Sequence, residues 1–198
     1  MSYSFQQIEQ ALSLLSRRLK LKGTPHITLV VCGGTALMAA SLQMRVTKDV
    51  DVVAMIDDQG VLVAPELPEK LKAAAKEVAL DLGLPADWLN NGPSSGPGGL
   101  FQLGLPHGIQ DRLIRREFGE NLTVCFTGRF DQIFFKLYAA VDRMGSYHAD
   151  DLCRLAPTDE ELLAAAAWAK TQDPSEGFAS AIREFMERFG YEHLASKL

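Results

Sequence analysis

The most informative part of the chain is VVCGGTALMAASLQMRVTKDVDVV, residues 30–53. Residues 27–32 form a short apolar run rich in β-branched side chains, which predicts a buried strand that ends at two consecutive glycines. The alanine, leucine and methionine of residues 35–43 predict a helix, and residues 49–56 predict a second strand. The sequence therefore predicts a strand, a glycine turn, a helix and a second strand in this order.

Two carboxylates open the second predicted strand, Asp49 and Asp51 with Val50 between them. Because residues i and i+2 of a strand point to the same face, we expect the carboxylates side by side and Val50 in the core. Adjacent carboxylates repel each other unless a cation or a proton lies between them. Mg²⁺ commonly binds one or two carboxylates together with substrate phosphates, so this pair predicts a magnesium site.

The glycine turn, Gly33 and Gly34, lies between the first strand and the helix. Glycine lets the backbone approach a ligand closely, and the N-terminus of a helix offers N–H groups and a positive dipole to phosphate. Thr35 adds a hydroxyl donor at the same place. We therefore expect the turn to hold a triphosphate while the neighbouring strand holds its metal.

This pattern resembles the core motif of the nucleotidyltransferase superfamily of the DNA polymerase β type. The shared features are a strand, Gly-Gly, a spacer (here 13 residues, 36–48) and Asp-x-Asp between hydrophobic residues. The residues just ahead of the aspartates also look like the R-x-T-x-D-x-D form of the bacterial branch related to AbiEii-type toxins. The resemblance implies Asp49 and Asp51 as catalytic metal ligands, and nucleotide binding by Gly33, Gly34, Thr35, Arg45 and Lys48.

A second match lies downstream, where Lys136 occupies a predicted helix, residues 130–143. It is followed by His148-Ala149-Asp150-Asp151-Leu152, which is similar to the H-x-x-D-L segment of the same branch. The resemblance implies a catalytic lysine, Lys136, acting with Asp150 or Asp151, and Asp151 has the position of the aspartate in the motif. Polymerase β-type enzymes usually carry a third carboxylate on a later strand, but the corresponding predicted strand here, residues 122–127, has none.

The resemblance implies an α+β fold, with a small mixed sheet flanked by helices and a helical C-terminal region. It also implies a Mg²⁺-dependent enzyme that transfers a nucleoside monophosphate from an NTP to an RNA or protein acceptor, as a toxin–antitoxin component with a cognate antitoxin. We expect a core with its N-terminal helix in residues 1–157, and a C-terminal helical region packed on that core in residues 158–198.

The missing third carboxylate leaves an alternative open, a catalytically inactive module that binds a nucleotide or another protein on the same fold. The residue patterns also have plain structural interpretations. Two glycines commonly form an ordinary strand-to-helix turn, and two aspartates can protect an exposed sheet edge. Lys136 can extend its ammonium group from an apolar helix face to water.

Composition narrows the class of protein. With 198 residues and 47% hydrophobic residues, the chain can bury a core as one domain, or one domain with a helical appendage. It has no apolar run of about 18 residues and no signal-peptide pattern at its start, so we expect no membrane association. Three widely spaced cysteines fit a reducing cytoplasm, and a net charge of −5 argues against a broad nucleic-acid-binding face.

Other local signals complete the expected layout. Capping boxes are predicted at Ser4 with Gln7 and at Thr158 with Glu161. Residues 112–118 are predicted to form the last part of a short helix. The basic side chains of residues 112–116 and of residues 17–22 are either candidate RNA contacts or simply solvated helix ends. The glycine- and proline-rich residues 90–99 predict a mobile loop, either a lid or a surface excursion.

Overall fold

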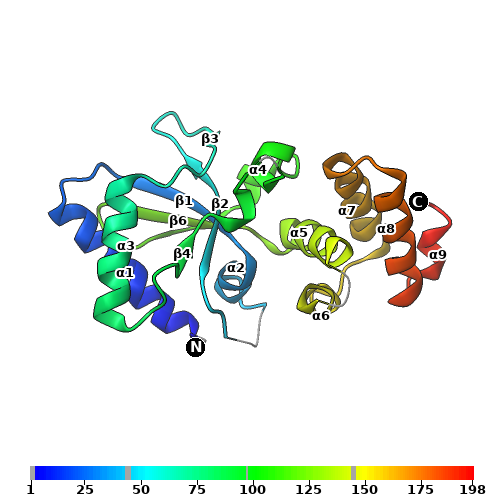
Figure 1. Ribbon diagram of the computed structural model, residues 1–198, viewed down its shortest axis with the longest axis horizontal. Helices are drawn as coiled ribbons and strands as arrows, with labels where there is room; N and C mark the ends of the chain where they lie inside the picture. Colours follow the sequence, from blue (N-terminus) through cyan, green and yellow to red (C-terminus); the bar gives the residue numbers. More distant parts are fainter. Residues whose placement is uncertain (1–2, 43–45, 97, 144–145) are drawn as a thin grey trace. The chain divides into compact units, whose positions relative to one another are not determined.

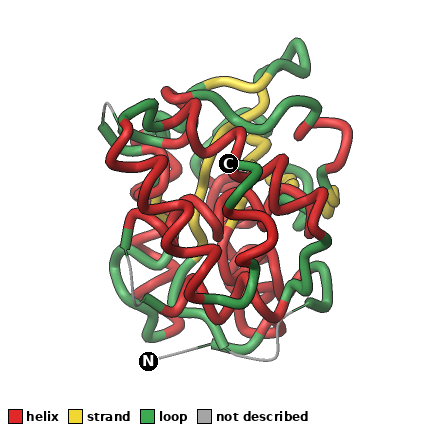
Figure 2. Tube along the Cα trace, turned by 90° about the vertical axis from the view of Figure 1, so that its right-hand side faces the viewer, coloured by secondary structure: helices red, strands yellow, loops and turns green. Residues whose placement is uncertain are grey.

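The computed structural model describes residues 3–42, 46–96, 98–143 and 146–198. The chain divides into two compact units, Met1–Gly128 and Arg129–Leu198. The first is built around a mixed β-sheet, whereas the described part of the second contains helices and loops without strands (Figure 2). The predicted α+β class is therefore confirmed. The domain division expected after residue 157 is a different boundary and stays a prediction.

The described residues of the first unit contain a six-stranded sheet in the order β3-β2-β1-β6-β5, with β4 paired to β2. The strands are β1 (Ile27–Cys32), β2 (Val50–Ile56), β3 (Leu62–Val63), β4 (Leu89–Asn90), β5 (Ile114–Glu117) and β6 (Leu122–Phe126). The central strand β1 has β2 as an antiparallel neighbour and β6 as a parallel one. Consequently the carboxyl end of β1, the amino end of β2 and the carboxyl end of β6 lie at one edge of the sheet.

Helices α1 (Phe5–Leu21) and α3 (Glu69–Leu82) lie against each other on one face of this sheet (Figure 1). Their apolar stripes form a single core with the strands, in which Leu12, Leu71, Leu29 and Phe126 are fully buried. Two shorter helices, α2 (Gly33–Ala39) and α4 (Leu100–Leu103), contact β2. Removing this apolar surface from water is the main stabilising contribution to the unit.

The second unit consists of α5 (Arg129–Asp142), α6 (Tyr147–Arg154), α7 (Asp159–Gln172), α8 (Glu176–Arg188) and α9 (Glu192–Ala195). Helix α5 is central and contacts α6, α7 and α8. Trp168 of α7 lies between aromatic rings of α5, with centroid distances of 5.8 Å to Phe134 and 6.0 Å to Tyr138. None of the helices in the described part of the chain is long and apolar enough to cross a membrane.

Both predicted capping boxes are confirmed. The Ser4 N–H donates to Gln7 Oε1 at 2.9 Å, and the Gln7 N–H donates to the Ser4 hydroxyl at 3.4 Å. Thr158 and Glu161 form the same reciprocal pair at the start of α7. Each box satisfies N–H groups that the first turn of a helix leaves without an intrahelical partner.

The helix predicted over residues 112–118 is wrong, because Ile114–Glu117 forms the strand β5, paired with β6. Its burial alternates residue by residue, with Arg115 and Glu117 exposed and Ile114 and Arg116 half-buried. That period of two belongs to a strand, and pairing with β6 outweighs the helical preference of arginine and glutamate.

The mobile loop predicted over residues 90–99 is also corrected in its first half. Leu89–Asn90 pairs with β2, and Gly92–Ser94 forms a 3₁₀ turn. Ser94 is buried, and its hydroxyl donates to the carbonyl oxygen of Val53 at 2.7 Å. Residues 90–94 are therefore tied to the sheet by main-chain pairing and by a buried side chain.

Candidate functional site

The first strand and the second strand meet at the glycine turn. Cys32 is paired with Asp51 in the antiparallel ladder between β1 and β2, and Gly33 follows immediately with a φ of +70°. A β-carbon added at Gly33 would lie 2.9 Å from Asp51 Oδ2. Only glycine combines this backbone conformation with this close approach, so the backbone at Gly33 lies directly against the Asp51 carboxylate.

Asp49 lies just before β2, which begins at Val50, one residue later than the predicted strand of residues 49–56. Its carbonyl oxygen accepts hydrogen bonds from the hydroxyls of Thr35 at 2.7 Å and Thr47 at 3.3 Å. Asp49 and Asp51 are half-buried, whereas Val50 between them is fully buried. The burial of Val50 agrees with its expected place in the core, whereas the side-by-side arrangement of the two carboxylates stays a prediction.

Thr35, expected to contact the nucleotide, lies fully buried within α2. A hydroxyl has one proton to donate, and Thr35 donates it to the backbone of Asp49. In this arrangement Thr35 holds the segment that carries Asp49. Its direct contact with a nucleotide stays a prediction.

Asn90 of β4 reaches Asp51 from the other side of β2. The two residues are partners in the parallel pairing of β2 with β4, and Asn90 Nδ2 donates to Asp51 Oδ1 at 3.2 Å. No signal in the sequence pointed to Asn90, because it lies at the start of a stretch dominated by glycine, proline and serine.

The donor set at this edge of the sheet could hold a hard divalent cation. Two carboxylates separated by one residue fit Mg²⁺ that arrives with a nucleotide, since Mg²⁺ keeps several waters and takes further ligands from phosphates. Over the described residues, no group of three or more His, Cys, Asp or Glu side chains is arranged to hold a metal ion.

The remaining predicted nucleotide-binding residues have different surroundings. Gly34 is half-buried in the first turn of α2, and Lys48 is exposed beside Asp49. Arg45 lies outside the described residues. Helix α2 has only seven residues, so a phosphate at its N-terminus would depend mainly on close approach to the backbone of the turn.

The predicted catalytic lysine forms a buried ion pair in the second unit. Lys136 Nζ of α5 donates to Asp151 Oδ2 of α6 at 2.9 Å, and the two side chains are 5% and 3% exposed. The ammonium group also lies 3.4 Å from His148 Nδ1 and 5.6 Å from the centre of the Tyr147 ring. Asp150, the alternative partner of Lys136, is exposed, whereas Asp151 forms the ion pair with Lys136.

Known proteins give no family assignment. No protein-family model, no curated protein and no solved structure matches the chain. The candidate site therefore depends on the chain's own residues.

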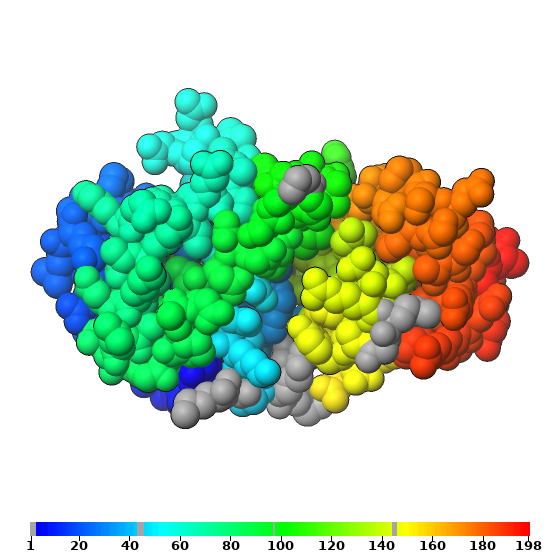
Figure 3. All heavy atoms as spheres, in the orientation of Figure 1, coloured from blue at the N-terminus to red at the C-terminus, as the bar shows by residue number. Residues whose placement is uncertain are grey.

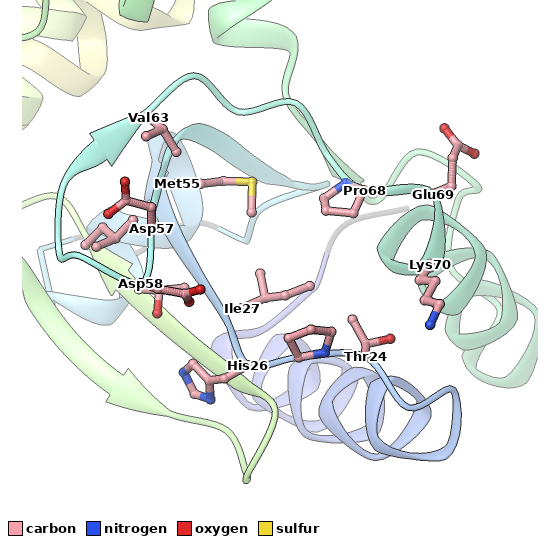
Figure 4. A pocket seen from close by; sticks show the side chains of 13 residues that line it. Thr24, His26, Ile27, Met55, Asp57, Asp58, Val63, Pro68, Glu69 and Lys70 are labelled. Atoms are coloured by element: carbon pink, nitrogen blue, oxygen red, sulfur yellow. The ribbon is translucent and has the colours of Figure 1, made fainter.

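An open groove of about 520 Å³ lies in the first unit, and neither Asp49 nor Asp51 lines it. Ile27 at the start of β1 and Met55 near the end of β2 lie within it, with Asp57 and Asp58 on one side (Figure 4). Because β1 and β2 are antiparallel, this is the opposite end of both strands from Cys32 and Asp51. The turn after β2 that carries Asp57 and Asp58 projects from the surface of the first unit (Figure 3).

Proposed function

We propose that the protein is a Mg²⁺-dependent nucleotidyltransferase that moves a nucleoside monophosphate from an NTP to an acceptor hydroxyl. The observation that carries this proposal is the contact of the Gly33 backbone with the Asp51 carboxylate, 2.9 Å from the β-carbon position at Gly33. A phosphate and a carboxylate-bound cation need to approach each other closely. A glycine turn beside an aspartate at one sheet edge provides that proximity.

Each group of this site has a distinct task in such a reaction. Asp49 and Asp51 would hold the Mg²⁺, and the backbone at Gly33 and Gly34 would pack against the phosphates of the NTP. A Mg²⁺ held by Asp49 and Asp51 would supply positive charge to offset the charge that develops on the leaving pyrophosphate. Thr35 and Thr47 keep the Asp49 backbone in place through their hydroxyls.

Lys136 and Asp151 enter the proposal through the resemblance to the AbiEii-like branch of the nucleotidyltransferases. A lysine ammonium group is a compact point charge that stabilises phosphate. Asp151 would orient it through their 2.9 Å ion pair. The same resemblance proposes an RNA or a protein as the acceptor and a cognate antitoxin as a partner.

A nucleotide-binding module without turnover is the second candidate function. It is favoured by the sequence of β6, Leu-Thr-Val-Cys-Phe, which lacks the third carboxylate of active polymerase β-type enzymes. Two carboxylates bind one Mg²⁺ with its nucleotide, but an additional ligand is needed where a second metal activates the acceptor.

The test incubates the full chain with Mg²⁺, each labelled NTP in turn, and cellular RNA or protein. We expect label transfer by the wild type, and none by the double variant Asp49→Asn with Asp51→Asn. The matched control is the double variant Asp57→Asn with Asp58→Asn, which removes the same two charges from the exposed turn at the far end of β2 and should keep full activity. Binding without transfer would select the second candidate, and the absence of any NTP binding would exclude both.

A further inference from the structure

The segment beside β2 that contains Asn90 is held at several points. Leu89 and Asn90 pair with Val50 and Asp51, Asn91 Nδ2 donates to the carbonyl oxygen of Pro65 at 2.8 Å, and the Ser94 hydroxyl reaches Val53. Through these contacts, residues 89–94, about 40 residues away in sequence, lie beside the candidate metal ligand Asp51.

The side-chain amide of Asn90 has a defined orientation. Its oxygen accepts the Gly92 N–H at 2.7 Å, and its nitrogen donates to Asp51 Oδ1 at 3.2 Å and to the carbonyl oxygen of Asp87 at 3.4 Å. A flipped amide would place its oxygen against a carboxylate and its NH₂ group against an N–H donor. The network therefore specifies that the amide directs one N–H toward Asp51 and the other toward the Asp87 carbonyl oxygen.

Glycine at position 92 is part of this arrangement. A β-carbon there would lie 2.9 Å from Asn90 Oδ1, which is closer than β-carbons approach such atoms. Glycine at position 92 thus leaves room for the Asn90 side-chain oxygen beside its backbone. With its oxygen held there, the Asn90 amide nitrogen is oriented toward Asp51.

We propose that Asn90 is a positioning residue that sets the rotation of the Asp51 carboxylate, an inference that rests on the proposed function for its consequence. By holding Oδ1, the amide turns Oδ2 toward the glycine turn at Gly33, where the metal and the phosphates would be bound. Groups that orient metal ligands in this way commonly change metal affinity 10–100-fold when they are removed.

The first experiment tests the contact without metal or nucleotide. The side-chain amide resonances of Asn90 are compared by NMR in the wild type and in Asp51→Ala. We expect the Asn90 signals to shift while those of Asn91, which bonds to Pro65 instead, stay unchanged. Unchanged Asn90 signals would overturn the inference, whatever the function of the protein.

The second experiment measures binding of Mn²⁺, in place of Mg²⁺, together with each of the four NTPs. Asn90→Ala should weaken binding about tenfold, whereas Asn91→Ala, which also removes one hydrogen bond of the same segment, should change it less than about twofold. Gly92→Ala should reproduce the effect of Asn90→Ala, because it displaces the amide without touching Asp51.

A double-mutant cycle separates positioning from a general loss of structure. Asn90→Ala should weaken binding no further in a chain that already carries Asp51→Ala. Equal weakening by Asn90→Ala and Asn91→Ala would contradict the inference. A wild type that binds no Mn²⁺–NTP, but whose Asn90 amide responds to Asp51→Ala, would refute the proposed function and uphold the contact.

Discussion

Gly33 at the start of α2 lies close to Asp51 of β2, because Asp51 Oδ2 is 2.9 Å from the place where any other residue at position 33 would have its β-carbon. The φ of +70° at Gly33 adds a second reason for glycine there. The backbone conformation and the neighbouring carboxylate thus impose the same residue type.

Gly33→Ala should therefore disturb both stability and the candidate site. The left-handed conformation costs an alanine about 1 kcal/mol, and the new methyl group displaces the Asp51 carboxylate. The control is Gly23→Ala, whose φ is +58° and whose β-carbon would meet nothing within 4 Å. Urea unfolding and Mg²⁺–NTP binding should show a similar backbone cost in both variants but weaker binding only in Gly33→Ala. Equal binding by the two variants would contradict this prediction.

Thr35 should affect the site through the backbone of Asp49. Thr35→Val keeps the shape of the buried side chain but removes the 2.7 Å hydrogen bond to the Asp49 carbonyl oxygen, at a cost of about 1 kcal/mol. Thr35→Ser keeps the hydroxyl and loses a buried methyl group, which costs a similar amount. We expect comparable unfolding free energies, but weaker Mg²⁺–NTP binding only for Thr35→Val. Normal binding by Thr35→Val would show that Asp49 does not need this support.

The buried pair Lys136 and Asp151 should be costly to break from one side. Lys136→Met leaves a carboxylate that is 3% exposed without its ammonium partner, which should lower the unfolding free energy by about 3 kcal/mol. The double variant Lys136→Met with Asp151→Leu should recover much of that loss, since it removes both charges. Circular dichroism during urea unfolding measures both values. A double variant as unstable as the single one would refute this account.

The same double variant also separates structure from catalysis. A stable double variant that transfers no nucleotide would place the pair in the reaction, as the resemblance implies. Full transfer by the stable double variant would restrict Lys136 and Asp151 to a structural role.

The Arg129–Glu161 pair predicts how stability changes with pH. Hydrogen bonding to Arg129, at 2.6 and 3.0 Å, is the main cause that holds the pKa of Glu161 below its usual value. Because the folded-state pKa of Glu161 is lower than the unfolded one, the stabilisation is complete above the unfolded pKa and is lost as pH falls through the folded-state pKa.

Glu161→Gln should therefore lower the melting temperature at pH 7 and make less difference at an acidic pH, where the folded-state carboxyl of Glu161 becomes protonated. Glutamine can still accept the Thr158 N–H at the start of α7, so the capping box is kept and the loss reports mainly on the charged pair. A wild type and a variant that differ equally at both pH values would contradict the assignment.

The local features of the chain were accessible from sequence. Ile27–Cys32 is the strand that its apolar run predicts, and both capping boxes form where a hydroxyl residue precedes glutamine or glutamate by three positions. The glycine turn and the two aspartates could also be selected, because a strand followed by Gly-Gly and then Asp-x-Asp is a distinct pattern. These signals are readable because they depend on neighbours within a few residues.

Strands β4 and β5 were not accessible in the same way. Leu89–Asn90 is too short to show any periodicity, and Ile114–Glu117 contains three charged residues in four, a composition that is also common in helices. Both form because a partner strand supplies their hydrogen bonds. Strand formation at such places is decided by context more than by intrinsic preference.

Asn90 is the clearest case of this difference at the candidate site. Short-range patterns in the chain select Asp51 as a candidate ligand and Gly33 as its neighbour, since both belong to one continuous motif. Placing the amide of Asn90 against Asp51 Oδ1 requires the pairing of β4 with β2, between residues far apart in sequence. Such pairing depends on long-range packing and hydrogen bonding in the folded chain. No local sequence pattern predicts it.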